Sequence, residues 1–223
     1  MKTLMPSVPV RLANRRRVYV APANMRYSPG ASREQVIPLK PLGEFWSDDE
    51  LLTLGTDSDT KHELRDGKVV AMPPAGYKHG AVIARLLAAV ATHVYRHRLG
   101  EVFDGQTGFR LSMDHCFAPD VSFVSRERLK LIAPGGDRLI HGSPDLAVEV
   151  LSPSDSITKT EKKIALYLTH GAQLAWMIDP KNKTCRIYRQ AGQFELLRGD
   201  RILSGNSILP GFRLPLSRIF SGI

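Results

Sequence analysis

A glutamate in the middle of an apolar strand is the sequence feature that most limits how this chain can fold. Glu149 stands between Ala147-Val148 and Val150-Leu151, a short apolar run typical of a buried strand. Strand side chains alternate between two faces, so Asp145, Ala147 and Glu149 share one face. Burying an unpaired carboxylate costs several kcal/mol, or shifts its pKa until it is neutral. The fold must therefore supply Glu149 with a bound cation or with a salt bridge.

A second acid opens another hydrophobic strand. Asp120 follows Pro119 and precedes the apolar residues from Val121 onward. Hard divalent ions such as Mg²⁺ bind carboxylate oxygens, usually one or two together with waters and substrate phosphate. The pair Asp120 and Glu149 therefore predicts a magnesium site, with a strand-start cap as the alternative for Asp120. Asp145 and Asp179 lie at strand ends, where a structural role is favoured.

Helical and strand patterns alternate around these acids, which predicts an α/β or α+β domain without internal repeats. Ser47 is typical of a helix N-terminus, Asp66-Gly67 of a tight hairpin turn, and Thr158-Lys159-Thr160-Glu161 of a capping box. Gly100 is expected just beyond the end of the long helix. The expected helices are 45–54, 81–99 and 158–171, and the expected strands are 62–65, 68–71, 102–111, 117–124, 145–151, 174–178, 186–189 and 193–197.

Charge is distributed unevenly along the 223 residues. The chain is 43% hydrophobic and 24% charged, which is ordinary globular composition and excludes a disordered, fibrous or membrane-bundle protein. The net charge is +9, but residues 1–40 hold eight basic residues and the single acid Glu34. We expect a basic, largely disordered extension over 1–40 and one domain over 41–223. The extension is either a nonspecific phosphate-binding tail or a solvated segment without function.

Cysteine and histidine patterns exclude several other site types. Cys116 and Cys185 form neither a disulfide framework nor a zinc site, and no apolar run is long enough to span a membrane, so a cytoplasmic location is expected. His93 and His97 have metal-ligand spacing but lack the glutamate of a zinc-protease helix, so a solvated face is favoured. Cys116 beside His115 lacks a third residue that would order a nucleophilic pair.

A longer series of motifs resembles one known family. An acid after proline at one strand start, followed by an acid-centred strand, resembles the PD-(D/E)XK nuclease superfamily. Within it, the chain from about residue 41 resembles the large bacterial Uma-two family of endonucleases. The matching segments, in the order in which that family has them, are Glu63-Leu64-Arg65-Asp66-Gly67, His79-Gly80, Ala118-Pro119-Asp120-Val121, 144–154, 163–167, Gly171, Trp176-Met177-Ile178-Asp179-Pro180 and Leu209-Pro210-Gly211-Phe212.

The resemblance implies a restriction-endonuclease-like fold, a mixed β-sheet core flanked by helices. The strand patterns add an N-terminal hairpin around Asp66-Gly67 and a C-terminal hairpin around Ala191-Gly192. It implies Asp120 and Glu149 as ligands of Mg²⁺, for which Mn²⁺ could substitute. The superfamily motif would place a lysine two residues after the second acid, but Leu151 stands there. In this family the lysine comes from the following helix, where Lys163 is the match, one turn before Tyr167.

Further residues follow from the same resemblance. Glu63 matches an additional acid of the superfamily and would act on metal or water indirectly, unless it is a surface charge of its hairpin. His79, at the start of the long helix, would touch a phosphate or a ligand carboxylate. Tyr167 and Asp145 are candidates for contacts with substrate or with the metal ligands. Lys162 points away from the apolar stripe and is expected to be solvated.

These features together predict a magnesium-dependent DNA endonuclease that hydrolyses phosphodiester bonds. DNA is the expected partner, no membrane partner is expected, and a homodimer stays an open alternative. A glycosidase would also use two carboxylates, but it would leave Lys163 and the low aromatic content of 7% unexplained. The strongest rival is a catalytically silent DNA-binding or assembly module on the same fold.

Overall fold

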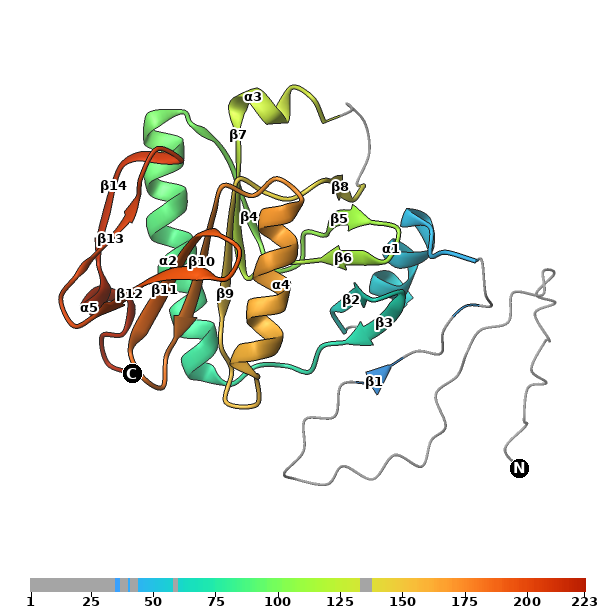
Figure 1. Ribbon diagram of the computed structural model, residues 1–223, viewed down its shortest axis with the longest axis horizontal. Coiled ribbons are helices and arrows are strands. Elements are labelled where there is room, and N and C mark those ends of the chain that lie inside the picture. Colours follow the sequence, from blue (N-terminus) through green and yellow to red (C-terminus); the bar gives the residue numbers. More distant parts are fainter. Residues whose placement is uncertain (1–34, 37–39, 41–43, 58–59, 133–137) are drawn as a thin grey trace, which may run out of the picture. The chain divides into compact units, whose positions relative to one another are not determined.

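The computed structural model describes residues 35–36, 40, 44–57, 60–132 and 138–223 (Figure 1). Most of the predicted extension over 1–40 lies outside these residues, so its proposed disorder stays a prediction. Within that segment, β1 (Gln35–Val36) pairs antiparallel with β3 (Lys68–Ala71).

A mixed six-stranded sheet forms the centre of the domain. β9 and β10 are parallel, and every other neighbouring pair in this sheet is antiparallel. In spatial order its strands are β12 (Gln193–Arg198), β11 (Thr184–Gln190), β10 (Leu174–Asp179), β9 (Leu146–Val150), β7 (Val121–Ser125) and β4 (Gly100–Asp104).

Helices cover both faces of this sheet (Figure 1). On one face, Val148 and Val150 pack in a cluster with α2 (Tyr77–His97). On the other, Ala147 packs in a cluster with α4 (Ile157–Thr169). The alternation of strand side chains thus places Glu149 on the α4 face.

Smaller elements complete the domain. β13 (Ile202–Gly205), β14 (Leu209–Pro215) and α5 (Leu216–Ile219) contribute to the core cluster on the α2 side. A second six-stranded sheet has the order β1, β3, β2 (His62–Arg65), β6 (His115–Phe117), β5 (Phe109–Ser112) and β8 (Ile140–His141). α1 (Asp48–Asp57) packs against that sheet, and α3 (Arg126–Leu129) follows β7. The mixed α/β fold predicted from the sequence is confirmed.

Two predicted strands each divide between the two sheets. The segment 102–111 forms β4 and β5 around a turn at Gly105, and 117–124 forms β6 and β7 around Pro119. Proline has no N–H to donate to a strand ladder, so the pairing breaks there. The break leaves Asp120 at the start of β7, beside the central sheet.

The predicted helix boundaries were partly wrong. The reciprocal bonds between Ser47 and Glu50 confirm the N-terminus of α1. α2 begins four residues earlier than expected, and Arg98, with φ 54°, takes the left-handed position after it. Gly100 instead belongs to β4, where a Cβ would lie 2.1 Å from the Val124 carbonyl oxygen. α4 begins after Ser156 and has no side-chain cap, so the predicted capping box does not form.

Candidate active site

Two neighbouring antiparallel strands bring the acids Asp120 and Glu149 together. β7 and β9 pair with Val121 opposite Val148, and this register continued by one residue sets Asp120 opposite Glu149. Asp120 Oδ2 accepts a hydrogen bond of 2.8 Å from the backbone N–H of Val150. The strand pairing therefore fixes Asp120 directly to the strand that carries Glu149.

The helix α4 supplies two side chains to Glu149. Lys163 Nζ lies 2.8 Å from Glu149 Oε1, and the Tyr167 hydroxyl donates to the same oxygen at 2.8 Å. The two residues are four apart on α4, so both project toward the sheet from one helical face. Lys163 Nζ also lies 5.4 Å from the centre of the Phe117 ring, which adds a cation–π contact.

Burial and the neighbouring charges determine the pKa values of Glu149 and Lys163. Burial raises the pKa of Glu149 above its ordinary value, and nearby Asp120 adds to this against the opposing effect of Lys163. Burial alone would lower the pKa of Lys163, but Glu149 and Glu63 outweigh it and raise the pKa. Lys163 therefore stays cationic, while Glu149 is the carboxylate whose ionised form most needs a further positive charge.

Glu63 is a buried acid with both carboxylate oxygens engaged. Oε1 accepts from Lys163 Nζ at 2.9 Å and from the backbone N–H of Ala118 at 3.1 Å. Oε2 accepts from the Arg65 guanidinium at 2.8 and 3.1 Å. Burial alone would raise the pKa of Glu63, but Lys163, Lys61 and Arg65 hold it well below its ordinary range. Glu63 is thus a buried anion that positions Lys163, and the surface alternative does not hold.

His79 reaches the same end of β9 from the first turn of α2. Its Nε2 lies 2.8 Å from the Val150 carbonyl oxygen and 3.7 Å from Asp120 Oδ2. Its Nδ1 is buried without a hydrogen-bond partner among the described residues. His79 therefore holds the backbone directly after Glu149 and stands beside Asp120.

Asp145, by contrast, lies at the far end of β9. Its carboxylate accepts from the Ser125 N–H at 2.7 Å and from Arg128 and Gln173 at 3.1 Å each. These bonds tie α3 and the start of β10 to the sheet. Asp145 is not brought together with the other candidates, and its contacts are those of a structural residue.

Lys61 is a residue at the site that the sequence reasoning missed. Its Nζ donates to the Ala118 carbonyl oxygen at 2.6 Å and lies 3.9 Å from Glu63 Oε1. The available signal was its position two residues before Glu63, which places both side chains on one face of an extended segment. Asp179, which the matching segments included, accepts instead from Asn182 within its own turn.

The alternative sites of the sequence analysis find ordinary structural explanations. His93 Nε2 lies 3.0 Å from the Pro210 carbonyl oxygen, and its ring packs 4.5 Å from that of His97. Burial raises the pKa of Cys116 to about 12, so its thiol is a poor nucleophile.

The carboxylates fit a hard divalent cation. Among the described residues, no hydrogen bond uses Asp120 Oδ1 or Glu149 Oε2, so each acid has one oxygen free for a cation. No group of three or more His, Cys, Asp or Glu side chains with metal-site geometry occurs in these ranges. Mg²⁺ needs only one or two carboxylates when water and phosphate complete its shell, so the donor pair is sufficient.

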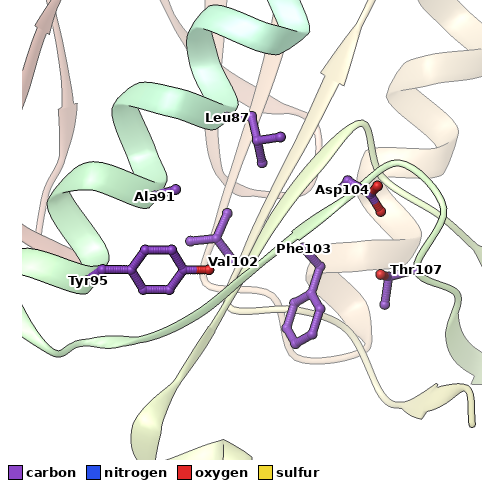
Figure 2. Close-up of a pocket in the computed structure, with 7 residues that line it drawn as sticks. All are labelled: Leu87, Ala91, Tyr95, Val102, Phe103, Asp104 and Thr107. Atoms are coloured by element: carbon purple, nitrogen blue, oxygen red, sulfur yellow. The ribbon is translucent and has the colours of Figure 1, made fainter. Parts of the chain in front are cut away.

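A cavity of about 370 Å³ lies elsewhere, between α2 and the edge strand β4. Figure 2 shows Leu87, Ala91 and Tyr95 from α2 on one side of it and Val102 of β4 nearest to them on the other. None of its lining residues is a candidate site residue, and its walls offer no cluster of titratable groups. The candidate active site is therefore the acidic end of β7 and β9, not this cavity.

Comparisons with known proteins find a matching family model and a similar solved structure. A family model named Uma2, with the description "Putative restriction endonuclease", matches residues 48–217. The chain is also similar to the crystal structure of a "putative nuclease belonging to DUF820" from Anabaena variabilis, with a TM-score of 0.67 and 28% identity, covering 78% of this chain and 96% of that one. No curated protein matches the chain. The structural likeness confirms the restriction-endonuclease-like fold that the sequence predicted.

Proposed function

Since the chain belongs to the Uma2 family of restriction-endonuclease-like proteins, we propose that it is a metal-dependent DNA endonuclease hydrolysing phosphodiester bonds. One observation carries the proposal. Asp120 and Glu149 meet across two neighbouring strands, each with an oxygen that no described residue uses, and Lys163 stands 2.8 Å from Glu149. This is a set of groups suited to a polyanionic substrate and a hard cation.

Asp120 and Glu149 would hold the metal, with Mg²⁺ as the expected ion and Mn²⁺ as a substitute. When bound there, such an ion lowers the pKa of a water and neutralises negative charge at the phosphate. The hydrogen bond from Tyr167 and the contact with Lys163 both fall on Glu149 Oε1. They orient the carboxylate and leave Oε2 for the ion.

Besides the two metal ligands, Lys163 is the residue with a direct role in the proposed reaction. Hydrolysis adds the oxygen of one water to phosphorus and breaks the bond to the 3′ oxygen, leaving 5′-phosphate and 3′-hydroxyl ends as the family resemblance implies. Negative charge builds up on the phosphoryl oxygens during this step, and a fixed ammonium group stabilises it or orients the water. Glu63 keeps Lys163 in place and cationic, so Glu63 acts through Lys163 rather than on the substrate.

The test is a nicking assay with supercoiled DNA and either Mg²⁺ or Mn²⁺. We expect wild type to nick the DNA, and Asp120→Asn, Glu149→Gln and Lys163→Met to lose about 100-fold or more in rate. Lys162→Met removes the same charge one position away, from an exposed side chain of α4, and should stay close to wild type. Undiminished nicking by Asp120→Asn would refute the assigned site. Binding of DNA by wild type without cleavage in either metal would favour a catalytically silent module.

A further inference from the structure

Lys61 is a second lysine beside Glu63, and it differs from Lys163 in its surroundings. Lys163 contacts two carboxylates, at 2.9 and 2.8 Å, and its side chain is 11% exposed. Among the described residues, Lys61 has no carboxylate that close, since Glu63 Oε1 is 3.9 Å away, and its side chain is 20% exposed. Lys163 is thus held by the acids, whereas Lys61 is the more accessible cation.

The position of Lys61 is fixed next to the start of β7. Its Nζ donates to the carbonyl oxygen of Ala118, two residues before Asp120. The turn after β4 passes alongside at Gly105, where a Cβ would lie 3.8 Å from Lys61 Nζ and 3.6 Å from the Asp120 Cα. Because glycine stands there, position 105 puts no side chain between Lys61 and Asp120.

The ammonium group of Lys61 keeps donors for a ligand. An ammonium carries three N–H groups. Within the ranges that the structure describes, the Lys61 ammonium makes one hydrogen bond, to the Ala118 carbonyl oxygen, so two of its N–H donors are not used by protein groups. A DNA strand that approaches Asp120, Glu149 and Glu63 meets three acids, and an accessible cation at the same place offsets their repulsion of a phosphate.

We propose that Lys61 binds a phosphate oxygen of the DNA backbone on the Asp120 side of the site, while Lys163 serves the reacting phosphate on the Glu149 side. This assignment rests on the proposed nuclease function and extends it to a substrate contact. The competing role of Lys61 is purely structural, since its bond to Ala118 also satisfies the backbone where the chain passes between the two sheets. The two roles differ in whether the charge of Lys61 is needed.

Lys61→Gln separates these roles, because glutamine keeps an N–H donor but removes the charge. The full chain is titrated with a fluorescently labelled DNA duplex over about 50 to 200 mM salt, with Ca²⁺, another oxygen-binding ion, in place of Mg²⁺. Gels run alongside verify that the duplex stays intact. Lys130→Gln is the matched control, because Lys130 is an exposed lysine whose side chain is 67% accessible, beyond the opposite end of β7.

The slope of log affinity against log salt should fall in magnitude by about 1 in Lys61→Gln, and Lys61→Arg should restore it. Lys130→Gln should match wild type. If Lys61→Gln unfolds, Gly105→Glu takes its place, since it puts a carboxylate within reach of Nζ while Lys61 itself is kept; the same fall in slope is expected. A slope unchanged from wild type would overturn the assignment and leave the nuclease proposal standing. Absence of salt-dependent binding by wild type would overturn both.

Discussion

The buried charges at the site are arranged so that each carboxylate has a different task. Glu63 accepts hydrogen bonds on both oxygens and is held ionised by three cations. Glu149 has one oxygen to which no residue in the described part of the chain donates, and it has a raised pKa. The same lysine, Lys163, contacts both acids. Glu63 therefore positions Lys163, whereas the ionised form of Glu149 would be stabilised by a bound cation.

The raised pKa of Glu149 predicts a pH-dependent gain in stability when its charge is removed. An acid whose pKa is raised in the folded state contributes stability that is fully present below its ordinary value of 4.5 and is lost as pH rises through the folded value. Without divalent metal, Glu149→Gln should thus unfold at a higher temperature than wild type near pH 8, with a difference that shrinks toward about pH 5. Thermal unfolding across this range is the measurement.

Glu161→Gln is the control for that comparison, because Glu161 is a partly exposed α4 glutamate paired with Arg186 at 2.6 Å. It should show no such gain near pH 8, since its pairing is lost with its charge. A Glu149→Gln variant that is less stable than wild type at every pH would contradict the reading that burial dominates at Glu149.

The elements show which parts of the fold could be predicted from local patterns. The hairpin of β2 and β3 forms where Asp66-Gly67 predicted it, with positive φ at both residues, and the long helix and the strand with Glu149 follow their periodicities. The division of the two strands could not be predicted. At Ala118 the backbone N–H and carbonyl bond to the side chains of Glu63 and Lys61, more than fifty residues earlier in the chain. Hydrogen bonds between residues so far apart in the chain leave no pattern in the local sequence from which they could be predicted.

Like the fold, the candidate site depends partly on local sequence patterns and partly on contacts between residues that are distant in the sequence. Alternation along β9 selected Glu149, whereas Lys163 and Tyr167 were selected through the family resemblance, with helical spacing on α4 as support. The three side chains do lie within contact distance of one another. The separation of Asp145 from them depends on Arg128 and Gln173, which come from different elements.

Substitution of Gly100 and of Gly80 by alanine should change the stability of the protein in opposite directions. A Cβ at Gly100 would meet the Val124 carbonyl oxygen of the neighbouring strand at 2.1 Å, whereas one at Gly80, inside α2, would have nothing within 4 Å. Gly100→Ala should therefore destabilise the protein by about 2 kcal/mol or more, and Gly80→Ala should stabilise it by roughly 0.5–1 kcal/mol. Chemical denaturation measures both; equal effects would contradict the different roles of the two sites.

For the molecule as a whole, charge is poor evidence for the proposed function. Eight of the 31 basic residues and one of the 22 acids lie in residues 1–40, so residues 41–223 are close to neutral. The case for a nuclease therefore rests on the site and on the family rather than on the net charge of +9. No helix in the described ranges is both long and apolar enough to cross a membrane.

The basic segment supports a separate prediction about affinity. Deleting residues 1–33 removes seven of the basic residues and no acid. If this segment contacts phosphates, the deletion should weaken DNA binding and flatten its salt dependence, while metal binding stays unchanged. Binding titrations of the full chain and the deletion variant at several salt concentrations measure this effect. An identical salt slope for both proteins would show that the segment contributes nothing.

Metal binding at Asp120 and Glu149 is the central claim, and isothermal titration calorimetry tests it most directly. Mn²⁺ or Mg²⁺ is titrated into wild type, Lys162→Met and the double variant Asp120→Asn/Glu149→Gln, with thermal unfolding as a check that each is folded. We expect saturable binding by wild type and Lys162→Met and none by the double variant. Equal binding by the folded double variant, or no binding by wild type, would contradict it.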